Sequence, residues 1–178
     1  MTTAVKNERQ IQRFKKWDVN GNGRIERSDY EAEAMRIIKA FGESPESPRG
    51  RAVRDAFIGM FEYQASEAGV GPNGALTQDQ FLAVNEKLMF KDGDVGFSRL
   101  LRPTIRAIVD LCDTDGDGEV NPAEFKTWLK AIGVSGADAD SAFQAIDTSG
   151  NGSLSVDELV NAVRDFHYGT LDVPLLGR

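Results

Sequence analysis

The 178-residue chain contains one cysteine, one histidine and no apolar run long enough to cross a membrane. A lone Cys112 excludes an intramolecular disulfide, and with His167 as the single histidine the usual ligand set of a zinc site cannot be assembled. Lys and Arg number 21 against 28 Asp and Glu, so the net charge of −7 has the wrong sign for binding a phosphate backbone. The first residues are polar and lack the apolar core of a signal peptide. We therefore expect a cytoplasmic protein that binds neither nucleic acid nor membranes, and that holds any metal through oxygen ligands.

The rest of the composition is that of a folded chain. Hydrophobic residues make up 40% of the sequence, which together with 18 glycines lies in the range of globular proteins. The length is little more than that of one average domain. One or two compact units follow from these two observations.

Three acidic, glycine-containing segments repeat one spacing of oxygen-bearing side chains. They are D-V-N-G-N-G-R-I-E-R-S-D (residues 18–29, loop 1), D-T-D-G-D-G-E-V-N-P-A-E (113–124, loop 3) and D-T-S-G-N-G-S-L-S-V-D-E (147–158, loop 4). Each has such side chains at positions 1, 3 and 5, glycine at 6, an aliphatic residue at 8 and a carboxylate at 12. This is the EF-hand calcium loop, in which alternate residues of a curved chain point at a hard cation with six to eight oxygen ligands. The sequence therefore predicts three Ca²⁺ sites.

The predicted ligands are the side chains at positions 1, 3, 5 and 12 and the carbonyl at position 7. They are Asp18, Asn20, Asn22, Arg24 and Asp29 in loop 1, Asp113, Asp115, Asp117, Glu119 and Glu124 in loop 3, and Asp147, Ser149, Asn151, Ser153 and Glu158 in loop 4. Loop 3 offers the most ligand carboxylates and is predicted to bind tightest. Asp29 is one methylene shorter than the usual Glu, so we expect Mg²⁺ to compete best at loop 1, where Glu26 at position 9 could add a ligand through water.

A fourth segment, residues 69–80 (loop 2), keeps the frame without the ligands. Gly74 stands at position 6 and Leu76 at position 8, but positions 1, 3 and 12 carry no carboxylate. We interpret loop 2 as a metal-free hand that is retained so that Leu76 can pair with Ile25 of loop 1.

Apolar residues recur at helical spacing on both sides of the loops, so each loop is expected to join two amphipathic helices. Asn121, Pro122 and Glu124 have the identities of an N-cap, N1 and N3, and Thr77 with Gln80 resembles a capping box. Pro103 is expected near the start of the helix before loop 3. The predicted fold is all-α, with four EF-hand units in two pairs packed as one compact globule.

The intervals between the loops divide the chain into two predicted pairs. Residues 1–92 form an N-terminal pair with an active first hand and a silent second hand, and residues 98–178 form a C-terminal pair with active third and fourth hands, followed by a tail. The acidic, glycine-containing segment around residues 91–98 is interpreted as the linker. Residues 168–176 are predicted to be a tail packed on the body, with a plug filling an apolar groove as the alternative.

The Trp17-Asp18 start of loop 1, the silent hand at 69–80 and the ending Val163-Arg164-Asp165-Phe166-His167 resemble the calerythrin-like, prokaryotic members of the sarcoplasmic calcium-binding protein family. The resemblance runs along nearly the whole chain. It implies two EF-hand pairs packed face to face and ion binding at hands one, three and four. The family is often described as calcium buffers or transporters, and the resemblance leaves the physiological role open.

Composition favours an intracellular Ca²⁺ buffer or transporter over a sensor. A sensor would open a Met-rich groove to a protein target, whereas this chain has 4 Met against 10 Phe, 2 Trp and 3 Tyr, which suit a fixed core. A buffer is expected to act as a monomer. The coelenterazine photoproteins resemble this fold, but His167, Tyr168 and two Trp are the only residues here that could act on such a ligand. The sequence also has no nucleophile-elbow, P-loop or dinucleotide motif, so we predict no enzyme activity.

Overall fold

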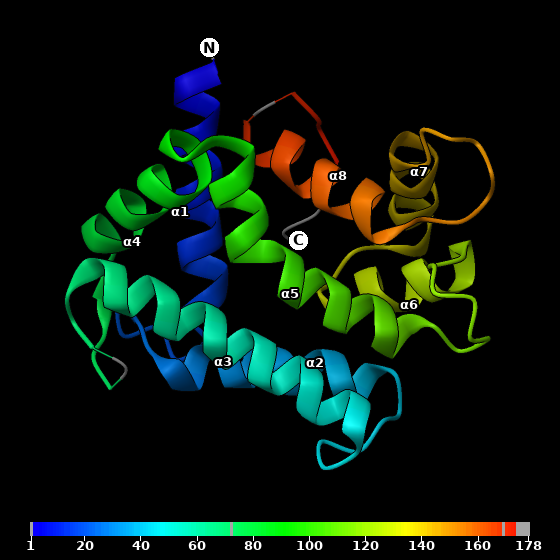
Figure 1. Ribbon diagram of the computed structural model, residues 1–178, viewed down its shortest axis with the longest axis horizontal. Coiled ribbons are helices and arrows are strands. Elements are labelled where there is room, and N and C mark those ends of the chain that lie inside the picture. Colours follow the sequence, from blue (N-terminus) through cyan, green and yellow to red (C-terminus); the bar gives the residue numbers. More distant parts are fainter. Residues whose placement is uncertain (1, 72, 169, 174–178) are drawn as a thin grey trace.

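The computed structural model describes residues 2–71, 73–168 and 170–173, and this part of the chain is built almost entirely of helices. Four helix-loop-helix units follow one another, which confirms the predicted all-α EF-hand fold (Figure 1). The helices are α1 (Thr2–Trp17), α2 (Arg27–Ala40), α3 (Pro48–Ala68), α4 (Gln78–Asn85), the π-helix η1 (Glu86–Lys91), α5 (Gly93–Cys112), α6 (Pro122–Ala131), α7 (Gly136–Ile146) and α8 (Val156–Tyr168). None of these helices has the length and apolar character needed to cross a membrane.

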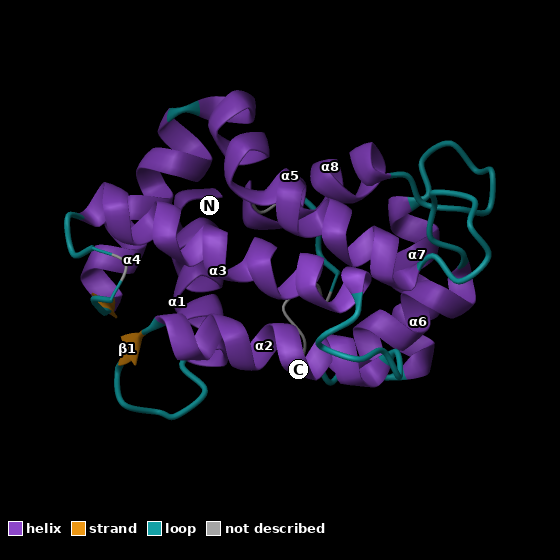
Figure 2. Ribbon diagram, turned by 60° about the horizontal axis from the view of Figure 1, so that its bottom comes forward, coloured by secondary structure: helices purple, strands orange, loops and turns teal. Residues whose placement is uncertain are grey.

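The loops pair through their eighth positions, as the sequence predicted. Strand β1 (Arg24–Ile25) runs antiparallel to β2 (Leu76–Thr77), with Ile25 opposite Leu76. Val120 and Leu154 form an antiparallel bridge, with N···O distances of 2.9 and 2.7 Å. All four aliphatic side chains are fully buried, so each bridge also anchors its loops to the core. The two loop pairs lie at opposite ends of the molecule (Figure 2).

Reciprocal side-chain caps start the helices that follow the loops. Thr77 and Gln80 form the predicted capping box of α4, and Asn121 with Glu124 forms that of α6, with Pro122 in its first turn. Glu26 and Asp29 form a third capping box, at the start of α2. These bonds satisfy backbone N–H groups that a helix start leaves free. The residue at position 12 of a loop is therefore also the third residue of the next helix.

The interpretation of residues 91–98 as a linker is wrong, because these residues are helical. The π-helix η1 leads through Asp92 into α5, which begins at Gly93 with a φ of +65°. The chain turns sharply here, and a Cβ on Gly96 would lie 2.5 Å from the carbonyl oxygen of Leu88. Glycine at both positions lets the two helical segments meet without an extended linker.

Pro103 lies inside α5 and not near its start, so that expectation is also wrong. The buried side chains of Phe97, Leu100 and Leu101 continue the apolar face of the helix toward its N-terminus. Burial of this extra face stabilises the longer helix and offsets the backbone hydrogen bond that proline removes.

The two halves pack face to face around one continuous core. Helix α3 packs against α5, α2 against α6, and α1 against α8. Figure 1 shows α5 running across the middle of the molecule, between the N-terminal helices and α6 to α8. Buried residues from both halves belong to one hydrophobic cluster. The compact globule expected from the sequence is confirmed.

A buried chain of hydrogen bonds, which the sequence analysis missed, joins four helices of the N-terminal half. The hydroxyl of Tyr30 donates to Gln64, whose Nε2 donates to Asn85 Oδ1 at 2.7 Å. Asn85 Nδ2 then donates to Gln10 Oε1 at 2.8 Å. These polar groups are satisfied by one another, which ties α2, α3, α4 and α1 together.

Part of the predicted tail packs on the body. Val173 is buried, Leu171 is partly buried against the core, and Arg9 Nη1 donates to the Leu171 carbonyl at 2.7 Å. Gly169 and residues 174–178 lie outside the described residues, and four of the nine residues of the proposed plug (168–176) are among them.

Candidate metal centres

Loops 1, 3 and 4 share one internal hydrogen-bond scaffold. In each, the Asp at position 1 accepts a hydrogen bond from the backbone N–H of the glycine at position 6. The O···N distances are 2.8 Å for Asp18 and Gly23, 2.8 Å for Asp113 and Gly118, and 2.9 Å for Asp147 and Gly152. These bonds curl each loop so that its odd-numbered side chains converge.

The side chain at position 5 accepts from the backbone N–H at position 7 in the same three loops. The distances are 2.9 Å for Asn22 and Arg24, 2.9 Å for Asp117 and Glu119, and 3.0 Å for Asn151 and Ser153. The hydrogen bond thus fixes the backbone at position 7 and does not involve its side chain. This agrees with the different residues found there, Arg24, Glu119 and Ser153.

Glycines at positions 4 and 6 give the loops their tight curvature. The predicted glycines at position 6 have φ values of +78°, +77° and +83°. Gly21, Gly116 and Gly150 at position 4 are also left-handed, at +69°, +78° and +69°. The recurrence of glycine at position 4 in all three segments is the sequence signal for this second left-handed residue, which was not among the predictions.

The carboxylate at position 12 is held through both of its oxygens. Glu124 Oε1 accepts from Asn121 N at 3.0 Å, and Oε2 accepts from the backbone and hydroxyl of Thr114 at 2.6 and 2.7 Å. Asp29 makes the equivalent contacts with the backbone of Glu26 (2.9 Å) and Val19 (3.1 Å). The shorter side chain therefore reaches the same place in the scaffold.

Glu158 in loop 4 is held in a similar way but is more exposed. Its Oε1 accepts from Ser155 N at 3.1 Å, and its Oε2 accepts from Ser149 N at 3.3 Å. Glu124 and Asp29 are 5% and 2% exposed, whereas Glu158 is half-buried. Burial raises the pKa of Asp29, against the hydrogen bonds from Glu26 and Val19.

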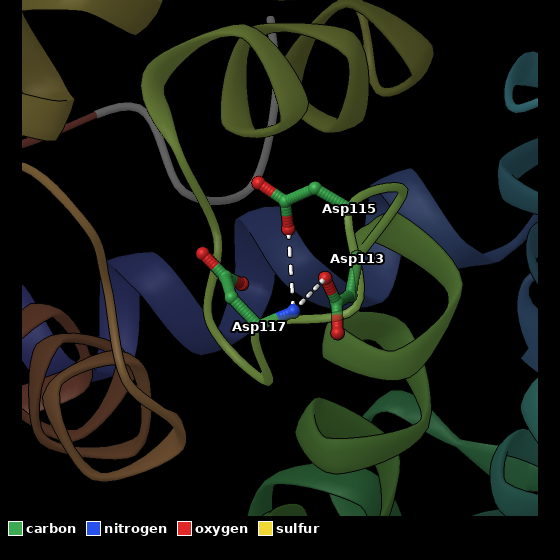
Figure 3. A group of neighbouring side chains, drawn as sticks. All are labelled: Asp113, Asp115 and Asp117. Atoms are coloured by element: carbon green, nitrogen blue, oxygen red, sulfur yellow. Dashed lines mark hydrogen bonds between the residues drawn. The ribbon is translucent and has the colours of Figure 1, made fainter.

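Loop 3 brings three carboxylates together. Oxygens of Asp113, Asp115 and Asp117 lie within 4.8 Å of one another, and the backbone N–H of Asp117 donates to the other two (Figure 3). Burial acts to raise the pKa of Asp113, but hydrogen bonds led by that of Gly118 outweigh it and lower this pKa. The neighbouring Asp113 raises the pKa of Asp115. Three oxygen donors of like charge in one loop fit a hard divalent cation.

Loop 2 has a different geometry. Gly69 ends α3 with a φ of +75°, and Gln80 at position 12 serves the α4 capping box, with its Oε1 accepting from Thr77 N at 2.9 Å. Gly74 at position 6 does not have the left-handed conformation of Gly23, and residue 72 lies outside the described part. The silent hand thus retains the capping box of α4 and the strand β2. Its described positions 1, 3 and 12 offer no carboxylate.

The fold and the loops together define an EF-hand protein with four helix-loop-helix units, three of which carry oxygen-bearing side chains at the ligand positions. A family model described as an EF-hand domain pair matches residues 102–164. Calerythrin of Saccharopolyspora erythraea is 49% identical over 177 residues, covering 99% of this chain and all of the relative. The chain belongs to the calerythrin-like family of calcium-binding EF-hand proteins.

Two solved structures extend the likeness. A Streptomyces coelicolor calcium-binding protein, described in terms of prokaryotic calcium-mediated regulation, has a TM-score of 0.76 and 32% identity, covering 91% of this chain and 98% of its own. Calcium-loaded apo-aequorin from Aequorea victoria has a TM-score of 0.74 and 26% identity, covering 93% of each chain.

Proposed function

We propose that the protein is an intracellular Ca²⁺ buffer that binds three ions, one each in loops 1, 3 and 4. The observation that carries this proposal is the common scaffold of these loops. Positions 1 and 5 make the same backbone contacts in all three, and the carboxylate at position 12 accepts from the backbone N–H at position 9. All donors at the ligand positions are oxygens, which suits Ca²⁺. Three bound ions would add +6 to a net charge of −7 and relieve most of the self-repulsion of the chain.

The three loops should differ in affinity and selectivity. Loop 3, with Asp113, Asp115, Asp117 and Glu124, supplies the most ligand charge and is proposed to be the tightest site. In loop 1 the ligand at position 12 is Asp29, which is one methylene shorter than Glu and is proposed to bind the ion through one oxygen, lowering the coordination number. Competition by Mg²⁺, which takes fewer ligands at shorter distances, is therefore proposed to be greatest there.

The proposed division of labour follows the two pairs. Residues 1–92 contribute one ion site and a silent hand that supports it through the pairing of Ile25 with Leu76. Residues 98–178 contribute the two remaining sites, joined through Val120 and Leu154. A silent hand can therefore pair with its neighbour through position 8 as an active hand does, without carrying ligands of its own.

A buffer is favoured over a sensor because the apolar faces of the two halves already cover each other. A sensor exposes a Met-rich groove when it binds Ca²⁺. Here Met60 and Met89 are 4% and 0% exposed, buried in the core that the halves share, and Met35 is 37% exposed at the surface. The rigid aromatic contacts of Trp17 with Tyr30 and of Phe125 with Trp128 also suit a fixed interior.

The second candidate is a Ca²⁺ sensor that regulates a partner protein. It is supported by the likeness to the Streptomyces coelicolor protein, which is described as a calcium-dependent regulator. In that case loading would separate the halves and uncover apolar surface for a target.

A Ca²⁺ titration monitored by hydrophobic-dye fluorescence at a constant millimolar-range Mg²⁺ concentration separates the two functions. A buffer should show no change or a fall in dye fluorescence while calorimetry counts three bound ions. A saturable rise in dye fluorescence with the same stoichiometry would replace the buffer by the sensor. Fewer than three ions would contradict the assignment of the sites.

A further inference from the structure

A cavity of about 90 Å³ lies between the two halves of the molecule, away from the loops. Its wall comes from α1, α2 and α3 on one side and from α5, α6 and α8 on the other. Most of the wall is apolar, with aromatic surface from Trp17, Phe57 and Trp128. The few polar groups belong to Arg13, Glu33, Thr104 and His167.

Arg13 is the unusual member of this wall. The residue is 5% exposed, and its Nε is the one buried side-chain nitrogen or oxygen in the described part of the chain that has no hydrogen-bond partner. Its Nη1 donates to His167 Nε2 at 3.1 Å, and the guanidinium lies over the Trp17 ring with 4.5 Å from Cζ to the ring centroid. A buried N–H of a cation that lacks a hydrogen-bond acceptor costs free energy of folding. An anion that accepts from this N–H would recover that cost and form a strong, charge-assisted hydrogen bond.

The two charged residues of the wall have opposite signs. Glu33 interacts electrostatically with Arg13, and its carboxylate is also bound by Arg36 Nη2 at 2.9 and 2.7 Å. His167 Nδ1–H donates to the Val163 carbonyl at 2.7 Å and Nε2 accepts from Arg13, which fixes the ring as a neutral tautomer. Among the described residues no salt bridge joins Arg13 to Glu33, so a bound carboxylate would be the first anion in direct contact with Arg13.

We propose that this cavity binds a small organic carboxylate, with the carboxylate on Arg13 and a compact apolar body against the aromatic wall. Apolar pockets with a few convergent polar groups are the usual form of small-molecule sites. An engineered apolar cavity of ~150 Å³ in another protein holds benzene, so the present cavity of about 90 Å³ is too small for a ring and admits a short chain. The proposal is independent of ion binding by the loops.

The test uses the full chain at saturating Ca²⁺ with butyrate and the smaller propionate as probes. Trp17 and Trp128 are the two tryptophans of the sequence and both line the cavity, so their indole N–H resonances in ¹H–¹⁵N spectra report on it. At least one probe should shift both resonances saturably with one-to-one stoichiometry. Arg13→Met should weaken that binding at least tenfold, and butyramide, the neutral isostere of butyrate, should bind more weakly than butyrate.

Two further variants make the result specific to the cavity. Lys16→Met removes one exposed positive charge from the same helix and should leave binding unchanged. Ile108→Phe fills the cavity from α5 while keeping Arg13, and should abolish binding even if Arg13→Met fails to fold. The proposal is overturned if neither probe shifts the resonances, which would mean that the cavity holds water only, or if Arg13→Met or Ile108→Phe binds as the wild type does.

Discussion

Glu124 performs two tasks with one carboxylate. Its Oε1 caps α6 through Asn121 and its Oε2 binds Thr114 at the start of loop 3, and the same carboxylate is the proposed ligand at position 12. Ion binding and the start of the helix are therefore coupled at a single side chain. Asp29 and Glu158 have the equivalent positions in the other two loops.

Glu124→Gln should weaken the tightest Ca²⁺-binding phase at least tenfold, about 1.4 kcal/mol or more. Gln keeps an oxygen that can accept from Asn121, so the fold should survive while a charged ligand is lost. Glu119→Gln is the matched control, because it removes a charge from the same loop at a position that offers only its carbonyl. Calorimetry that found the tightest phase unchanged in Glu124→Gln would refute the ranking of the loops.

His167 is a buried residue whose protonation opposes folding. Burial, with Arg13 and Arg9 nearby, lowers its pKa from 6.5 to about 3. Between about pH 3 and 6.5 the folded state therefore keeps the ring neutral, whereas the unfolded state binds a second ring proton. The stability is complete above pH 6.5 and falls as the pH drops below it.

His167→Gln should remove this pH dependence while keeping a donor for Val163 and an acceptor for Arg13. Between pH 7.5 and pH 5.0 the wild type should lose roughly 2 kcal/mol more of its free energy of unfolding than the variant, from about 1.4 kcal/mol per pH unit. Urea unfolding of both proteins at saturating Ca²⁺ measures the difference. Equal losses would show that His167 is not buried in its neutral form.

At the scale of the elements, the sequence predicted what depends on local chemistry. The capping boxes at Thr77 and Asn121, and the pairing of Ile25 with Leu76, follow from residues close together in the chain or at equivalent loop positions. The junction of η1 and α5 could not be predicted, because it depends on Gly96 meeting the carbonyl of Leu88 across a turn. Glycine in a polar segment usually indicates a loop, but here tertiary packing stabilises two helical segments that meet at these glycines.

Two glycine-to-alanine changes compare the junction with an open helix. Gly96→Ala places a Cβ 2.5 Å from Leu88 O and 2.3 Å from Asp92 Cβ, and should cost at least about 2 kcal/mol, in the range of overpacked sites. Gly59→Ala, inside α3 with nothing within 4 Å of the added Cβ, should stabilise the protein by up to about 1 kcal/mol. Urea unfolding of the two variants gives both values, and equal effects would contradict the close approach at Gly96.

At the scale of the whole molecule, the sequence predicted two pairs and one globule but not the contents of their interface. The loops could be recognised from spacing alone, since their ligands are contiguous in sequence. The group of Arg13, Glu33 and His167 is assembled from α1, α2 and α8, and no spacing connects these residues. Their burial follows from α1 packing on α8, a contact between the two ends of the chain.

Because one core spans both halves, they should unfold together. Trp128→Phe leaves Trp17 to report on the N-terminal half, and Trp17→Phe leaves Trp128 to report on the C-terminal half. In each variant the urea midpoint from tryptophan fluorescence should coincide with that from far-UV circular dichroism. Separate midpoints would show two independently stable pairs.

The backbone hydrogen bonds within the loops also bear on how quickly the protein exchanges ions. Asp18, Asp113 and Asp147 are each bound to the glycine N–H five residues further on, so the curl of each loop is set by the protein itself. An arriving ion then has to rotate side chains and displace water, without a search through backbone conformations. We expect all three sites to capture Ca²⁺ at similar rates and to differ mainly in how long they hold it. Such a protein would damp a sudden rise in calcium at once and return the ions in stages, loop 3 last.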